Sequence, residues 1–101
     1  MRARIPIDRE RVTDFCQRHH VRKLSLFGSV LRDDFRADSD VDVLIEFDPS
    51  HIPGFLRLGQ MERELSSILG SRRLDVLTPK SLHPAILDRV LSDAEVHFDG
   101  G

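Results

Sequence analysis

Acidic side chains are concentrated in one short stretch of this 101-residue chain. Between positions 33 and 48 the sequence has seven carboxylates and a single basic residue. Two of the carboxylates, Asp40 and Asp42, stand at the start of the apolar segment Val41–Phe47, which reads as a β-strand. Aspartate is a poor strand former, and like charges two residues apart on one strand face repel each other. The clustering therefore calls for a chemical explanation.

A bound divalent cation would explain the clustering. Side chains alternate along a strand, so Asp40 and Asp42 point to the same face, roughly 6–7 Å apart. Asp75 is a third carboxylate, in the otherwise apolar sequence LDVL. If the strand of Asp75 lies beside the first strand, the three carboxylates can converge. Oxygen ligands of this kind suit Mg²⁺ or Mn²⁺, whereas zinc prefers Cys and His.

Two other interpretations of the acidic stretch were open. A random acidic cluster most often covers a solvated edge, and this is how we interpret Asp38. The sequence DSDVD also has the carboxylate spacing of an EF-hand loop. However, Val43 stands where that loop needs Gly, and Pro49 stands where it needs Glu. A calcium loop of that type is excluded.

Gly28 and Ser29 stand where a strand gives way to a predicted helix. Glycine permits close backbone approach, and the free N–H groups of a helix start can bind phosphate. Taken alone, Ser29 is better explained as a simple helix N-cap. The phosphate interpretation gains from the ten residues that separate Ser29 from Asp40. A phosphate cradle beside a metal-binding pair is what phosphoryl and nucleotidyl transfer require.

Composition limits the remaining function classes. The net charge is −2, so no global basic field favours binding along nucleic acid, and we expect no direct nucleic-acid contact. Cys16 is the single cysteine; it falls on a helical apolar stripe, which predicts a core position and fits a reducing cytoplasm. No signal peptide is recognisable, and no apolar segment nears the ~20 residues that cross a bilayer. We expect a cytoplasmic protein with no membrane contact.

The elements that must position these residues alternate along the chain. Helices are predicted over about 8–20, 29–34, 55–69 and 84–91, and strands over 21–27, 41–47, 73–78 and 95–98. Asp8 can cap the first helix, Gly70 follows a helix end, and Pro84 suits a first helical turn. This order predicts one α/β domain over residues 1–101, with two layers and a central sheet.

The pattern GS-x10-DxD, followed by an Asp in an apolar strand, resembles the nucleotidyltransferase superfamily that includes DNA polymerase β. Length and layout are similar to its minimal MNT-type members, the antitoxins paired with HEPN-domain toxins. The resemblance spans about residues 21–91. It implies an α/β (α+β) nucleotidyltransferase fold, in which a central mixed β-sheet packs against helices.

The resemblance also implies a mechanism and a partner. It implies transfer of a nucleotide, AMP from ATP, to a hydroxyl of a partner protein, a tyrosine of a HEPN-type toxin, within a hetero-oligomer. In the family the Gly-Ser turn holds the triphosphate, and the three acids bind two Mg²⁺ ions, with Mn²⁺ as a substitute. Carried onto this chain, the nucleotide-binding residues are Gly28, Ser29 and Arg32, and the catalytic and metal-binding residues are Asp40, Asp42 and Asp75.

The chain departs from the family pattern at the turn. Members often read GSxARG, whereas here Leu31 replaces a small residue and Asp33 replaces Gly. A carboxylate near the triphosphate would weaken nucleotide binding unless Asp33 faces solvent. Arg32 is either a phosphate contact or an ion-pair partner of a neighbouring Asp. Two alternatives follow: a non-catalytic antitoxin that neutralises its partner by contact, and a catalytic half that needs a second chain to bind substrate.

Overall fold

The computed structural model describes residues 3–100 and has the predicted order of elements. The helices are α1 (Arg9–Arg18), α2 (Phe55–Ile68) and α3 (Pro84–Asp93). The strands are β1 (Val21–Phe27), β2 (Val41–Phe47), β3 (Leu74–Leu77) and β4 (Glu95–Asp99), and two 3-10 turns are η1 (Gly28–Leu31) and η2 (Pro79–Ser81). The predicted bounds of β1 and β2 are confirmed, because both segments are rich in apolar and β-branched residues and end at turn-forming residues.

Two predicted helices differ from the observed elements. Helix α1 begins after its N-cap Asp8 as predicted, but it ends at Arg18, because His20 adopts a left-handed φ of 57° to turn the chain into β1. The helix predicted over 29–34 is only the four-residue turn η1, since Arg32 is already extended, with φ −111° and ψ 160°. The segment between η1 and β2 is therefore mostly loop.

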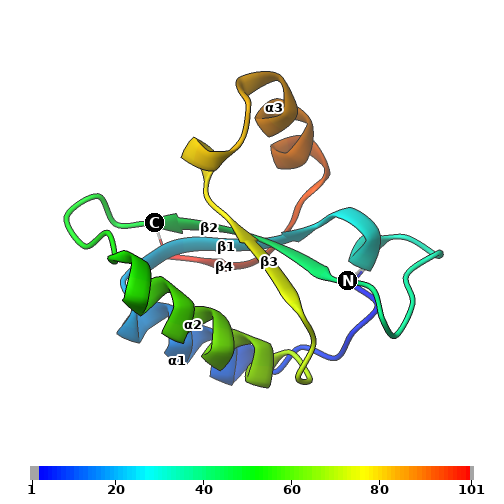
Figure 1. Cartoon of the computed structure of the whole chain (residues 1–101), viewed down its shortest axis with the longest axis horizontal. Helices are drawn as coiled ribbons and strands as arrows, with labels where there is room; N and C mark the ends of the chain where they lie inside the picture. The colour runs from blue at the N-terminus through cyan, green and yellow to red at the C-terminus, as the bar shows by residue number, and fades with distance from the viewer. Residues whose placement is uncertain (1–2, 101) are drawn as a thin grey trace.

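The four strands form one mixed sheet in the order β3-β2-β1-β4. Strand β1 is antiparallel to both β2 and β4, whereas β2 and β3 run parallel. Parallel neighbours need a crossover connection, and α2 supplies it between β2 and β3 (Figure 1). The central mixed sheet and the predicted strand near the end of the chain are confirmed, and that strand, β4, lies at one edge of the sheet.

The apolar core lies between one face of the sheet and helices α1 and α2 (Figure 1). Cys16 is fully buried there, as predicted. Helix α3 lies on the opposite side of the sheet and has no buried residue. The two-layer body thus consists of the sheet with α1 and α2, and α3 is added on the second face. Within residues 3–100, no helix has the length and apolar character that crossing a membrane requires.

Candidate functional site

The parallel pairing of β2 and β3 places Asp42 directly beside Asp75. Residues in register on adjacent strands point to the same face, and the strands themselves lie about 4.8 Å apart. The neighbouring pair, Val43 and Val76, packs against the core on the α1 and α2 side. The two carboxylates therefore lie on the other face of the sheet, the side on which α3 sits (Figure 1).

The Gly-Ser turn begins beside the same carboxylate. Strand β1 pairs with β2 so that Phe27 is opposite Asp42, and η1 starts at the next residue, Gly28. Gly28 has a left-handed φ of +77°, and a Cβ added there would overlap Oδ2 of Asp42. Glycine is thus needed twice, for the backbone conformation and for the close approach of the turn to the carboxylate.

The position of Asp42 disfavours the charged form of its carboxyl group. Burial raises the pKa of Asp42 above its usual value, and the negative charges of Asp75 and then Asp40 raise it further, with Arg32 acting in the opposite direction. Perturbed ionisable groups of this kind cluster at functional sites as well as in structural ion-pair networks. Asp40, Asp75 and Arg32 therefore lie close enough to Asp42 for their charges to act on it.

Asp40, just before β2, forms an ion pair with Arg73. Nε of Arg73 lies 3.2 Å from Oδ1 of Asp40, and the Arg73 carbonyl accepts a 2.9 Å hydrogen bond from the Val41 N–H. Arg73 stands two residues before Asp75, as Asp40 stands two before Asp42, so the parallel register of β2 and β3 brings the two side chains together. Its neighbour Arg72 behaves differently and lies over the ring of Phe35.

The three acids fit a metal ion by chemistry but are not assembled around one. Among residues 3–100, no three Asp, Glu, His or Cys side chains are arranged so that they could hold a metal ion. Asp40 is engaged by Arg73, while Asp42 and Asp75 are in register. A set of carboxylate oxygens suits a hard cation such as Mg²⁺, and a cation would relieve the repulsion that raises the pKa of Asp42.

The departures from the family turn also have local explanations. Asp33 has a side chain that is 94% exposed and forms an ion pair with Arg4. Leu31 is partly buried and packs against the core. Nε of Arg32 lies 3.5 Å from Oδ1 of Asp34, and the charge of Arg32 also lowers the pKa of Asp42. Arg32 is thus an ion-pair partner of a neighbouring Asp whose charge still reaches the acidic site.

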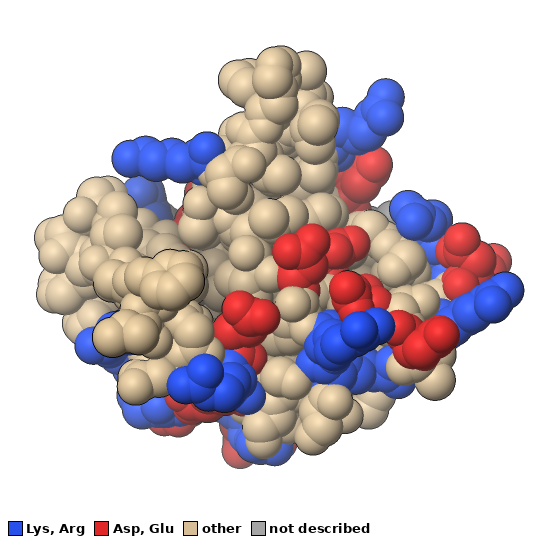
Figure 2. Space-filling model, in the orientation of Figure 1, with Lys and Arg blue, Asp and Glu red and all other residues tan. Residues whose placement is uncertain are grey.

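Figure 2 shows how these charges are distributed on the surface. Acidic side chains gather near the middle of the visible face, over the turn after β1 and the start of β2, with basic side chains beside them. The part of the surface over α3 that faces the viewer is uncharged. The acidic cluster is therefore open to solvent on this face and borders an uncharged area.

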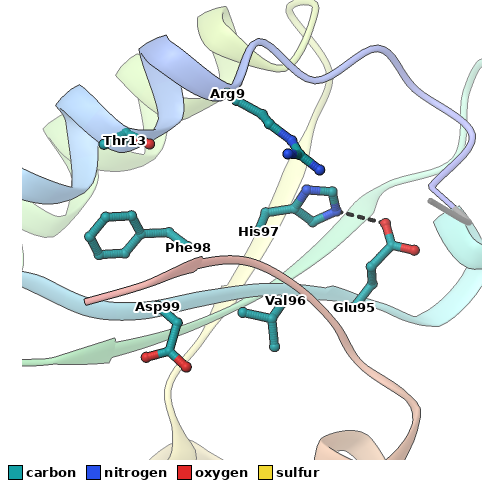
Figure 3. Close-up of a pocket in the computed structure, with 7 residues that line it drawn as sticks. All are labelled: Arg9, Thr13, Glu95, Val96, His97, Phe98 and Asp99. Carbon is teal, nitrogen blue, oxygen red and sulfur yellow. Dashed lines mark hydrogen bonds and ion pairs between the residues drawn. The ribbon is translucent and has the colours of Figure 1, made fainter. Parts of the chain in front are cut away.

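A separate hollow of about 600 Å³ lies between α1 and the edge strand β4 (Figure 3). His97 and Phe98 lie on the α1 side of β4, while Val96 and Asp99 point to the other side. Nε2 of His97 lies 2.8 Å from Oε1 of Glu95, and the His97 side chain is 5% exposed. Because α1 covers the face opposite to Asp42 and Asp75, this hollow is not part of the acidic site.

Comparisons with known proteins agree with this geometry. The model of the family described as "Nucleotidyltransferase domain" matches residues 9–97. The chain is 36% identical over 77 residues to the protein adenylyltransferase MntA of Thermococcus cleftensis, which covers 76% of this chain and 75% of that protein. A solved structure provisionally named a minimal nucleotidyltransferase is 33% identical, with a TM-score of 0.71 over 86% of both chains.

A more distant structure shares the fold. It is a tri-AMPylated HEPN toxin of Shewanella oneidensis in complex with an MNT antitoxin, and the match is 14% identical with a TM-score of 0.63. It covers 90% of this chain and 69% of the matched chain. With a family match across most of its length and a relative above 30% identity, this chain belongs to the nucleotidyltransferase domain family.

Proposed function

We propose that this protein is a metal-dependent nucleotidyltransferase that transfers AMP from ATP to a hydroxyl group of a partner protein. The observation that carries the proposal is the register of β2 and β3, which sets Asp42 beside Asp75 on the face where the Gly28 turn approaches Asp42. Membership of the family and the adenylyltransferase name of the 36% identical relative support the reaction type.

Each residue of this site would have a separate role in the reaction. Asp40, Asp42 and Asp75 would hold the divalent ions, which supply charge neutralisation at the phosphates and activation of the acceptor hydroxyl when bound. The backbone of Gly28 and the Ser29 hydroxyl would bind the triphosphate, since no side chain at Gly28 obstructs a phosphate oxygen. Arg32 would add positive charge beside them. Asp75, which is exposed on β3, would accept the proton of the attacking hydroxyl.

The acceptor in this proposal is a tyrosine of a HEPN-type toxin, which the chain neutralises as its antitoxin within a hetero-oligomer in the cytoplasm. The support is the similar fold of an MNT antitoxin that was solved with an AMPylated HEPN toxin. A second function is favoured by one observation: among residues 3–100 the acids are not arranged to hold a metal ion. A non-catalytic antitoxin that acts by contact alone would have no need of that arrangement.

Incubation with ATP labelled at the α-phosphate, Mg²⁺ and the protein product of the neighbouring gene separates the two functions. We expect label on the partner with the wild-type protein and none with Asp42→Asn. Asp38→Asn is the matched control, because Asp38 is an exposed loop carboxylate in the same acidic stretch, and it should retain transfer. A folded wild-type protein that binds the partner but transfers no label would refute the enzyme and favour the contact antitoxin.

A further inference from the structure

We propose that Arg73 is a positioning residue that keeps Asp40 in an ion pair until the ion binds together with the nucleotide. This inference rests on the proposed function, because it concerns the same metal site. Its starting point is that Asp42 and Asp75 are in register, whereas the third acid is paired with Arg73.

The backbone fixes where Arg73 can act. The Val41 N–H donates to the Arg73 carbonyl, and Val41 is in register with Leu74, so the segments before β2 and β3 are joined one residue ahead of the sheet. By alternation along these segments, Arg73 shares the face of Asp75 and Asp40 shares that of Asp42. Arg73 therefore lies on the same face of the sheet as the three acids, Asp40, Asp42 and Asp75.

The ion pair between Arg73 and Asp40 is exposed and can be broken at low cost. The side chains of Arg73 and Asp40 are 80% and 52% exposed, and the guanidinium also donates a 3.4 Å hydrogen bond to the Asp38 carbonyl. Exposed ion pairs of this kind shift an equilibrium by about fivefold at most. A divalent ion that carries twice the charge of Arg73 can displace it, but the competition must weaken binding of the free ion.

Displacement leaves the guanidinium beside the metal site without its ion-pair partner Asp40. A nucleotide triphosphate supplies the matching anion, and arginine binds phosphate well through its planar group of donors. Arg73 would thus exchange Asp40 for phosphate only when ion and nucleotide bind together. The free ion alone would gain no such compensation, so the site would favour the ion–nucleotide complex over the ion.

Binding measurements on Arg73→Gln test both halves of this exchange. Affinity for Mn²⁺ alone, measured by electron paramagnetic resonance without nucleotide, should rise about two- to fivefold, because Asp40 is released. Affinity for Mg²⁺–ATP, measured by calorimetry, should fall, because the phosphates lose a cation. Arg73→Lys keeps the charge and should stay near wild type in the Mn²⁺ measurement.

Arg72→Gln is the matched control, since Arg72 contacts Phe35 and the Ala37 carbonyl in place of Asp40. It should leave Mn²⁺ affinity unchanged. Unchanged or weaker Mn²⁺ binding by Arg73→Gln overturns the inference. An equal gain in affinity for Mn²⁺ and for Mg²⁺–ATP overturns the claim that Arg73 binds phosphate after it releases Asp40. Asp42→Asn tests the metal site itself. If the wild-type protein binds no Mn²⁺, or if Asp42→Asn binds Mn²⁺ equally well, the proposed function fails as well. If Asp42→Asn removes Mn²⁺ binding, the result for Arg73→Gln decides only the inference about Arg73.

Discussion

At the scale of single residues, the acidic site works against folding. Asp42 is partly buried next to two like charges. Arg32 lowers the pKa of Asp42, but its guanidinium is also paired with Asp34. Asp40 differs from Asp42 because Arg73 pairs with it. The cost of keeping the acids together therefore falls mainly on Asp42.

Asp42→Asn should raise the metal-free melting temperature at pH 7 by on the order of a few degrees. The folded protein has a raised Asp42 pKa, so it favours the neutral carboxyl, and the ionised form above that pKa destabilises it. The gain should be present above the raised pKa of the folded state and vanish as the pH falls below the usual value of 3.8, where the carboxyl is protonated in both states.

Thermal unfolding followed by circular dichroism in EDTA checks this pH dependence. Asp38→Asn, in the exposed loop, should change the melting temperature little, both at pH 7 and below pH 3.8. A lower metal-free melting temperature for Asp42→Asn at pH 7 would contradict the inferred cost of burying the charged carboxylate beside two other acids.

At the scale of elements, the turn η1 ties the phosphate-binding candidate to the acids. The pairing of Phe27 with Asp42 brings the start of η1 to the start of β2. The turn is short because the chain is extended again at Arg32, and this sends Asp33 toward Arg4 instead of toward the acids. The family departure at Asp33 is therefore accommodated by the geometry of one turn.

Gly28→Ala should lower the free energy of unfolding by at least about 1–2 kcal/mol, the cost of a left-handed conformation for an L-residue. It should also abolish ATP binding, because the added methyl group displaces the Asp42 carboxylate. Urea denaturation and calorimetry with Mg²⁺–ATP measure the two effects.

Gly70→Ala is the matched control for this substitution. Gly70 has a φ of +90°, but an added Cβ would meet nothing within 4 Å. It should therefore lose similar stability while retaining nucleotide binding. Equal nucleotide affinities for the Gly28 and Gly70 variants would disprove a special role of the turn.

At the scale of the whole molecule, the buried core and the exposed apolar side chains lie in different parts of the fold. The core between the sheet and helices α1 and α2 is fully packed, whereas α3 has no buried residue. At the start of α2, Phe55 is 91% exposed, so it belongs to the surface, and Leu58 is only partly buried. Local opening should begin in α3, because few buried contacts hold it.

Cys16 provides a single chemical reporter of the core. Burial raises the pKa of its thiol to about 12, and the thiolate is the reactive form. Alkylation by iodoacetamide at pH 8 should be at least about a hundredfold slower in the folded protein than in guanidinium chloride. Mass spectrometry of timed samples gives both rates. Rapid labelling of the folded protein would mean that the α1 packing opens without global unfolding.

Much of the fold could be predicted because it depends on local pattern. The alternation and β-branched content of β1 and β2, the apolar spacing of α2, and the capping residue Asp8 act over a few residues, and their bounds were predicted closely. The helix after Gly28 was overestimated, since the competition between a 3-10 turn and an α-helix depends on how the following loop packs.

For the site, the sequence by itself determined which side chains could do chemistry: two acids flanking one valine, a third in an apolar strand, and a glycine at a strand end. Tertiary structure alone decided that Asp42 and Asp75 are in register, that Gly28 approaches Asp42, and that Arg73 engages Asp40. Local patterns depend on neighbours along the chain, whereas strand order and register depend on how distant segments pack together, and spacing in sequence does not encode those contacts.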